Sequence, residues 1–185
     1  MSLRSISPLD GRYARQLSEL GDHVSEYALI RARVRVEVEW LLVLAPDLDA
    51  AALRSAYDDF SEEDAQAVKD IEKRTNHDVK AVEYFLREKV PPEQRELVHF
   101  GLTSEDVNNL SHALMLKGAL EQAWLPAARS LTDAVSDLAR QTKATPLLSR
   151  THGQAATPTT FGKEMAVFVS RFRRQIEQIE RQEYR

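Results

Sequence analysis

Residues 157–185 read TPTTFGKEMAVFVSRFRRQIEQIERQEYR, and this stretch decides the fold class. Thr157 followed by Pro158 is a strong helix start, because a hydroxyl caps the helix and proline suits its first turn. Apolar side chains then recur at steps of four, three, four, four and three: Phe161, Met165, Phe168, Phe172, Ile176 and Ile179. Such a narrow stripe is typical of a helix packed in a bundle. A helix over residues 158–185 would form a rod of about 42 Å.

The rest of the chain also carries helical patterns. Helices are expected over residues 24–45, 62–73, 78–89, 93–100 and 104–142. Pro126 should kink or divide the last of these, since it has no amide to donate within a helix. Residues 144–156 have no period and are rich in Thr, Pro and Ser, so they are expected to form a loop.

Residues 34–40 alternate apolar and polar side chains, as a strand would. They are nevertheless assigned to a helix, because no second alternating run exists to pair with such a strand. Arg33 with Glu37, and Arg35 with Glu39, form i,i+4 pairs that favour the helix.

The expected fold is therefore all-α, with an N-terminal helical domain followed by the start of a long-helix bundle. The first domain is expected over residues 1–103, with an irregular arm over residues 1–22. The second is expected over residues 104–185. Its last helix reaches Arg185 with no Gly, Asn or Pro stop signal, so we expect a bundle domain cut short and a natural chain that continues.

The amino-acid composition argues against several classes of function. The 25 Lys and Arg against 29 Asp and Glu give a net charge of −4, which argues against a nucleic-acid binder. No apolar run approaches the ~20 residues that span a bilayer, and the start lacks a signal peptide's apolar region. We therefore expect a cytoplasmic protein that binds no membrane. The absence of cysteine excludes thiolate metal sites and thiol catalysis, and neither zinc nor calcium spacing is present, so no metal is expected.

Three polar segments stand just before or at expected helix starts: residues 75–78, 103–104 and 149–154. The free N–H groups of a helix N-terminus favour anions, so three such segments brought together would suit a ligand with several carboxylates or a phosphate. Each segment taken singly is better explained as an ordinary cap, and a site competes with that interpretation only when the three are taken together. Of the five histidines, His77 and His152 lie in these polar segments, where an imidazole can serve as a general acid or base. His99, at a helix end, is left undecided.

Four of these stretches resemble motifs of bacterial adenylosuccinate lyases, in the order of that family. They are SPLDGRY at 7–13, RTNHDVKAVEYFL at 74–86, HFGLTSEDVNNLSHAL at 99–114 and SRTHGQAATPTT at 149–160. The TSED and THGQ elements by themselves indicate only the fumarase/aspartase superfamily. The NHDVKAVEY run is what points to the adenylosuccinate branch.

The resemblance implies an all-α homotetramer that cleaves adenylosuccinate to AMP and fumarate. It also implies cleavage of the succinylated aminoimidazole carboxamide ribotide of purine biosynthesis, with no cofactor and no metal. Carried over by position, His152 would be the general acid. The expected substrate-binding residues are Arg12 and Tyr13 for the phosphate, Thr103 and Ser104 for a succinyl carboxylate, and Asn76, His77, Asp78, Thr151 and Gln154 around the remainder.

The resemblance also shows what is missing. The family's general base is a serine in a mobile Gly/Ser-rich loop, and nothing like that loop occurs in residues 1–185. The 185-residue chain is therefore expected to be inactive by itself. Two alternatives remain: another superfamily member, such as argininosuccinate lyase or aspartase, and a helical module that binds partners through the Phe161–Ile179 stripe.

Overall fold

The computed structural model describes residues 6–184, and the chain forms two compact units. The first extends to Ala119 and the second spans Leu120–Glu183. The expected all-α class is confirmed, since a two-stranded hairpin is the only sheet among the described residues. None of the helices in this part of the chain combines the length and apolar character that crossing a bilayer requires.

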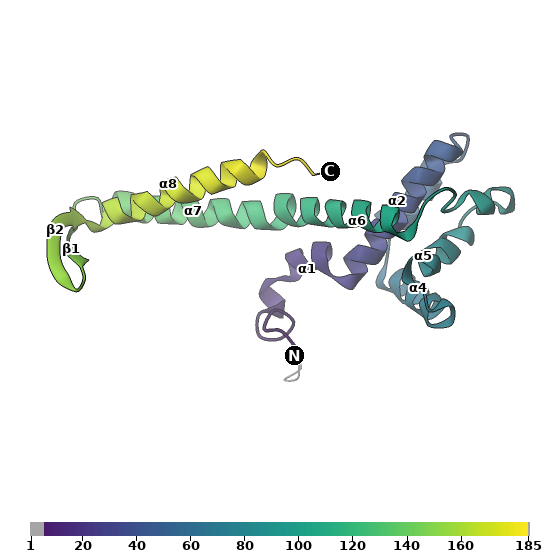
Figure 1. Ribbon diagram of the computed structural model, residues 1–185, viewed down its shortest axis with the longest axis horizontal. Helices are drawn as coiled ribbons and strands as arrows, with labels where there is room; N and C mark the ends of the chain where they lie inside the picture. The colour runs from purple at the N-terminus through teal and green to yellow at the C-terminus, as the bar shows by residue number, and fades with distance from the viewer. Residues whose placement is uncertain (1–5, 185) are drawn as a thin grey trace. The chain divides into compact units, whose positions relative to one another are not determined.

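The first unit is built from helices (Figure 1). Its elements are the 3₁₀ turn η1 (Ala14–Gln16), α1 (Ser18–Val24), α2 (Glu26–Leu44), α3 (Ala50–Asp58), α4 (Glu62–Thr75), α5 (Asp78–Arg87), the 3₁₀ turn η2 (Pro92–Leu97) and α6 (Ser104–Gly118). Expected starts are confirmed at two of them, where Ser61 and Thr103 each form a capping box with the aspartate three residues on.

Helix α2 is the centre of this unit, because α1, α3, α4, α5 and α6 all pack against it. Val34 and Val38 belong to the main apolar cluster, whereas Val36 faces a second cluster with Val79 and Val107. The strand-like alternation of residues 34–40 thus has a helical explanation. A helix buried on most of its sides needs apolar residues in more than one direction, which obscures the 3.6-residue period.

Three segments of the first unit differ from the expectation. Residues 93–100 were expected to form a helix, and only the 3₁₀ turn η2 forms there. The arm over residues 1–22 is not wholly irregular, because η1 and α1 form within its described part. Helix α3 was not expected; Asp49 caps it by accepting from the amides of Ala51 and Ala52. Both helices are short, so they offer few turns over which a period could be recognised.

The long helix expected over residues 104–142 is divided, as Pro126 predicts. A π-helical segment, η3 (Ala119–Trp124), separates α6 from α7 (Leu125–Gln141). Pro126 has no N–H to return to the preceding turn, and a widened turn just before it accommodates that loss.

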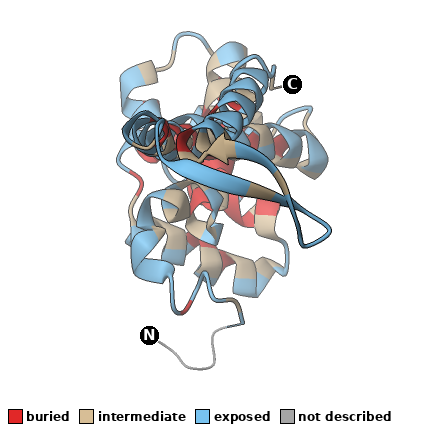
Figure 2. Ribbon diagram, turned by 90° about the vertical axis from the view of Figure 1, so that its left-hand side faces the viewer, coloured by how far each residue is buried: buried red, intermediate tan, exposed pale blue. Residues whose placement is uncertain are grey.

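The second unit contains α7, a hairpin of β1 (Pro146–Thr151) and β2 (Gln154–Thr160), and α8 (Phe161–Glu180). The expected loop at 144–156 is therefore wrong, and so is the helix start at Thr157: residues 154–160 form a strand, and Thr160 caps α8. Pro158 sits opposite Leu148, next to a register shift, where a strand tolerates a proline. Figure 2 shows this hairpin almost wholly exposed.

Helices α7 and α8 lie side by side and run in opposite directions (Figure 1). Gly162, Val169 and Ile176, each seven residues apart, are the buried residues of α8. The expected stripe is thus only partly buried, since Phe168 and Phe172 stay exposed with their rings 6.4 Å apart. One neighbouring helix covers one side of α8 only.

Gly162 allows the closest approach in this unit. A Cβ built there would lie 2.3 Å from the carbonyl oxygen of Ala139 and 2.6 Å from the amide nitrogen of Lys143. The amide of Gly162 also donates to the carbonyl of Thr142 over 3.1 Å, so the backbones of α7 and α8 touch where the two helices meet.

We therefore predict that Gly162→Ala lowers the free energy of unfolding by about 1–3 kcal/mol, because backbone cannot move aside as a side chain can. Urea denaturation measures the change. Gly21→Ala is the matched control, since nothing lies within 4 Å of its Cβ and it stands inside α1. That control should be neutral or stabilising. Equal stability of the two variants would contradict the close approach.

Candidate active site

The second motif forms the junction between α4 and α5. Asn76 ends α4 in the left-handed conformation, with φ of 51°, which asparagine tolerates better than most residues. His77 then caps α5: its Nδ1 accepts the backbone N–H of Lys80 over 3.2 Å. Because Nδ1 acts as an acceptor, a neutral His77 carries its proton on Nε2. The exposed ring therefore presents a hydrogen-bond donor.

Arg33, from the middle of α2, joins this motif to the next one. It is buried, with 6% of its surface exposed. Its Nη2 donates to Asp78 Oδ2 over 2.7 Å, and its Nε donates to Asn108 Oδ1 over 2.9 Å. Asp78 stands in the first turn of α5 and Asn108 in the second turn of α6. One guanidinium thus connects the N-terminal turns of two helices.

Burial raises the pKa of Asp78, but the backbone hydrogen bond from Val79 and the Arg33 guanidinium outweigh that effect. The pKa of this carboxyl therefore lies below its usual range. Asp78 is an anion near neutrality, and its charge is matched by Arg33. It positions the start of α5 and has no proton to give there.

His99 and Glu37 form a second link to α2. Glu37 is 1% exposed, and its Oε1 lies 2.5 Å from Nδ1 of His99. His99 itself has φ of 64°, in the left-handed region. The next residue, Phe100, is held as well, because Trp40 Nε1 donates to its carbonyl oxygen over 2.8 Å. The turn before α6 is therefore held onto α2 at two consecutive residues.

Thr103 and Ser104 begin α6. The Thr103 hydroxyl donates to Asp106 Oδ2 over 2.7 Å and accepts the Asp106 amide over 3.3 Å. The backbone and side-chain hydrogen bonds from Thr103, with a contribution from nearby His99, hold the pKa of Asp106 below its usual range. The Thr103 hydroxyl is thus occupied by the cap. The backbone amides in the first turn of α6 are the donors that remain for an anion.

Arg12 and Tyr13 lie in the arm, with the Arg12 guanidinium carbon 5.7 Å from the centre of the Tyr13 ring. Both are exposed. The amide of Tyr13 donates to the carbonyl of Pro8 over 2.9 Å, which closes the turn that carries them. From there η1 and α1 connect the arm to the helices, since α1 packs on α2 and α6.

Thr151, His152 and Gln154 lie at the tip of the hairpin in the second unit. Thr151 pairs with Gln154, and the two residues between them turn the chain with φ of 49° at His152 and 77° at Gly153. Positive φ at both positions is the pattern of a type I′ turn, which fits the twist of a two-residue hairpin. His152 is exposed, with its two predicted neighbours flanking it.

The structure thus brings together Asn76, His77 and Asp78 at one junction, and it links them through Arg33 to α6, which Thr103 and Ser104 begin. Thr151, His152 and Gln154 form a separate cluster in the other unit. In the part of the chain that is described, no group of three or more His, Asp or Glu side chains has the arrangement to hold a metal ion.

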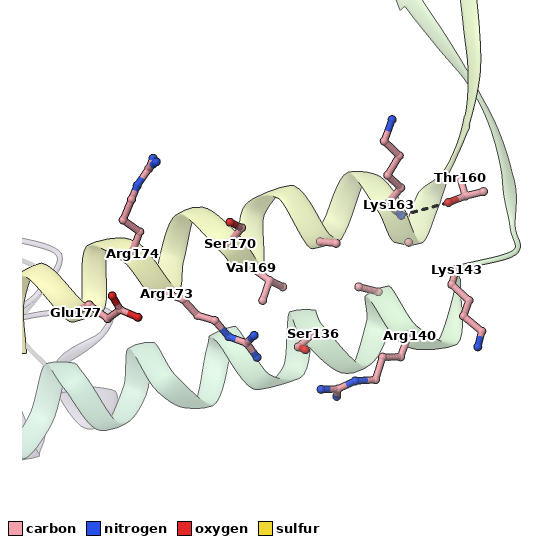
Figure 3. Close-up of a pocket in the computed structure, with 13 residues that line it drawn as sticks. Ser136, Arg140, Lys143, Thr160, Lys163, Val169, Ser170, Arg173, Arg174 and Glu177 are labelled. Carbon is pink, nitrogen blue, oxygen red and sulfur yellow. Dashed lines mark hydrogen bonds between the residues drawn. The ribbon is translucent and has the colours of Figure 1, made fainter.

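A groove of about 670 Å³ separates α7 from α8 and contains none of these residues (Figure 3). Its labelled cations point in different directions: Lys163 and Arg174 project away from α7, and Arg140 projects away from α8. Arg140 is paired with Asp137 over 2.5 Å. The groove is a space between two helices with dispersed charges.

Residues 9–185 match the lyase family Lyase_1. The chain belongs to this family. Adenylosuccinate lyase of Escherichia coli K12 is 53% identical, over 96% of this chain and 42% of the relative. The enzymes of that name from Haemophilus influenzae and Dictyostelium discoideum are 47% and 43% identical, over 98% and 97% of this chain. The chain spans about two fifths of the length of the curated relatives it matches.

Solved structures show the same fold. A fumarate lyase from Mesorhizobium sp. BNC1 matches with a TM-score of 0.72 at 24% identity, over 88% of this chain and 39% of that one. A 3-carboxy-cis,cis-muconate lactonizing enzyme from Pseudomonas putida matches with a TM-score of 0.71 at 22% identity, over 87% of this chain and 38% of that one.

Sequence reasoning missed Arg33, Glu37 and Asn108. It assigned Arg33 and Glu37 to an intrahelical pair, but each binds a residue from another motif instead. No clear signal for them exists in the sequence, because charged residues stand at every second position from Arg31 to Glu39, and only packing shows that Arg33 and Glu37 are the buried ones. A charge that packing buries must find a partner.

We predict that Arg33→Met lowers the free energy of unfolding at about pH 7 by roughly 1–3 kcal/mol, because Asp78 and Asn108 lose a charged donor. Since Asp78 has a lowered pKa, its stabilising effect is present above its unfolded pKa of about 4 and is lost as pH falls through the lowered value. As pH falls, the free energy of unfolding should therefore decrease less in Arg33→Met than in the wild type. Denaturant titrations across that pH range measure both effects.

Arg35→Met is the matched control, since Arg35 is exposed on the same helix. It should change stability by less than about 0.5 kcal/mol. If both variants behave alike, Arg33 does not connect the two helix starts.

Proposed function

We propose that this chain is part of an adenylosuccinate lyase, which eliminates fumarate from adenylosuccinate to leave AMP. The same chemistry would act on succinylaminoimidazole carboxamide ribotide in purine biosynthesis, in the cytoplasm. The observation that carries the proposal is the similarity, at 41–53% identity over nearly the whole chain, to relatives of that name. The helix starts of the second and third motifs add support, since they offer donors to an anionic substrate.

In this proposal His152 is the general acid that protonates the leaving nitrogen. Its exposed position on a hairpin tip suits a group that must meet a substrate. Thr151 and Gln154 flank it and contact the substrate beside it. Thr103 and Ser104, at the start of α6, bind a succinyl carboxylate, and Arg12 and Tyr13 hold the nucleotide phosphate. Asn76, His77 and Asp78 line the site between them.

The reaction needs these parts for a physical reason. Elimination removes a weakly acidic proton from the carbon beside a carboxylate, so negative charge grows on that carboxylate in the transition state. Donors already aimed at it lower the barrier, and the amides of a helix N-terminus are such donors. The leaving nitrogen needs a proton, which an imidazole that titrates near neutrality supplies. The general base remains to be assigned, because no segment of this chain resembles the family's serine loop.

A homotetramer would complete the site in this proposal, with several copies contributing residues. The exposed Phe168 and Phe172 support such an assembly, since an apolar helix face favours burial against another chain. The exposed hairpin supports it as well, because an isolated two-stranded hairpin is marginally stable without further packing.

Cleavage of adenylosuccinate, followed by absorbance, tests the proposal. The full-length protein, meaning this chain with whatever follows it in its gene, should convert adenylosuccinate, while the 185-residue chain should not. Turnover of argininosuccinate or aspartate instead would favour another superfamily member. No lyase activity in either form would favour a helical module that binds partners through the Phe161–Ile179 stripe.

His152→Ala in the full-length protein should lower kcat by about 10²- to 10⁴-fold, because the leaving nitrogen loses its proton donor. Steady-state assays of adenylosuccinate cleavage measure the loss. His112→Ala is the control, since His112 is an exposed histidine within α6. Near-normal turnover of His152→Ala would remove the general acid from this position.

A further inference from the structure

We propose that Glu37 is a positioning residue that acts through His99, fixing which imidazole nitrogen is left for the site and whether that nitrogen donates or accepts. The inference rests on the proposed function, because it gives the pair a part at the same site. It also gives His99, which sequence reasoning left undecided, a definite chemical state.

The first support is the geometry of the pair. Glu37 Oε1 lies 2.5 Å from Nδ1 of His99, so Nδ1 is committed to the carboxylate. The other nitrogen, Nε2, is the one left for any further partner. The two ring nitrogens of a histidine are distinct in this way, since the bond made by one sets the role of the other. In a neutral ring Nε2 accepts when Nδ1 donates to Glu37. It carries a proton to donate, which suits an anionic oxygen, when Nδ1 accepts the Glu37 carboxyl proton.

The second support is burial. The Glu37 side chain is 0% exposed, whereas that of His99 is 17% exposed. The Oε2 atom of Glu37 has no hydrogen-bond partner among the described residues. A buried carboxylate with one strong contact is costly for folding. That cost points to a role for the carboxyl group, and His99 is the group it contacts.

The third support is the backbone around His99. His99 occupies the left-handed region, which is uncommon for residues with a side chain. The Trp40 hydrogen bond to Phe100 holds the same turn in place. An electrostatic effect of His99 also helps to lower the pKa of Asp106, which places the ring near the start of α6 and its Thr103 cap. These contacts maintain the strained backbone. They therefore hold one imidazole close to the helix start that binds a carboxylate in the proposed function.

Burial and the surrounding charges set the pKa of Glu37. Burial raises the pKa of Glu37 most, His99 lowers it, and Glu83 of α5 raises it again, leaving it above the ordinary value. Glu83 is itself held by Lys80 over 2.5 Å and by Arg87 over 3.1 Å. The Glu37 carboxyl group therefore keeps a proton more readily than an ordinary glutamate does, which favours donation from Oε1 to Nδ1 and leaves the ring proton on Nε2.

The test compares Glu37→Gln with Glu39→Gln in the full-length protein. Glutamine keeps the shape of Glu37 and removes its charge. Glu39 is two residues away on the same helix, and its carboxylate is engaged by Arg54 and Tyr57 instead of His99. Glu37→Gln should shift the NMR resonances of the His99 ring nitrogens, because an amide cannot exchange a proton with Nδ1 as a carboxyl group does. Histidine-selective ¹⁵N labelling, with His99→Gln for assignment, measures this without any substrate.

Activity supplies the second readout. Glu37→Gln should lower kcat/KM for adenylosuccinate by about tenfold and shift its pH profile, whereas Glu39→Gln should leave both unchanged. In a His99→Gln background the same Glu37→Gln change should have no further effect, because a residue that acts through His99 has nothing left to act on. If Glu37→Gln loses its fold, Glu37→Asp keeps the carboxyl group and should keep the His99 ring-nitrogen resonances near their wild-type positions.

The outcomes separate the two proposals. Unchanged ring-nitrogen resonances of His99 in Glu37→Gln, or equal losses of kcat/KM with and without His99, would overturn the positioning role. A wild-type protein that does not cleave adenylosuccinate would overturn the proposed function, while the NMR measurement would still decide whether Glu37 controls His99.

Discussion

Two charged side chains, Arg33 and Glu37, are buried in the central helix of the first unit, and each must therefore be neutralised by a partner. Arg33 takes Asp78 and Asn108, and Glu37 takes His99. These partners come from the second and third motifs, which lie far apart in sequence from α2. The same requirement that stabilises the unit thus places two segments of the candidate site around one helix.

Local backbone geometry, instead of a buried charge, shapes the hairpin of the second unit. This hairpin has little buried surface, and its strands are joined by a two-residue turn with positive φ at His152 and Gly153. Gly162 then lets α8 start against the end of α7. The His152 imidazole on this tip is accessible, and its turn fixes the backbone that carries it.

Much of the candidate site could be read from the sequence, because it lies in contiguous motifs. The caps at Ser61 and Thr103 were predicted, since an N-cap depends on residues within one turn. The hairpin was missed, because Thr, Pro and Ser are typical of loops and the residues on both strands are mostly exposed. The α3 helix was missed because it is short.

The sequence by itself determined the helical class, the caps at Ser61 and Thr103 and the family motifs, all of which depend on neighbouring residues. It also placed Pro126 where the long helix divides. Only the tertiary structure decided that α2 is central, that its charges bind Asp78 and His99, and that Phe168 and Phe172 stay exposed. The reason is physical: a pattern along one helix shows which residues can share a face. Which faces are covered depends on helices distant in sequence, and the partner of a buried charge depends on how those helices pack.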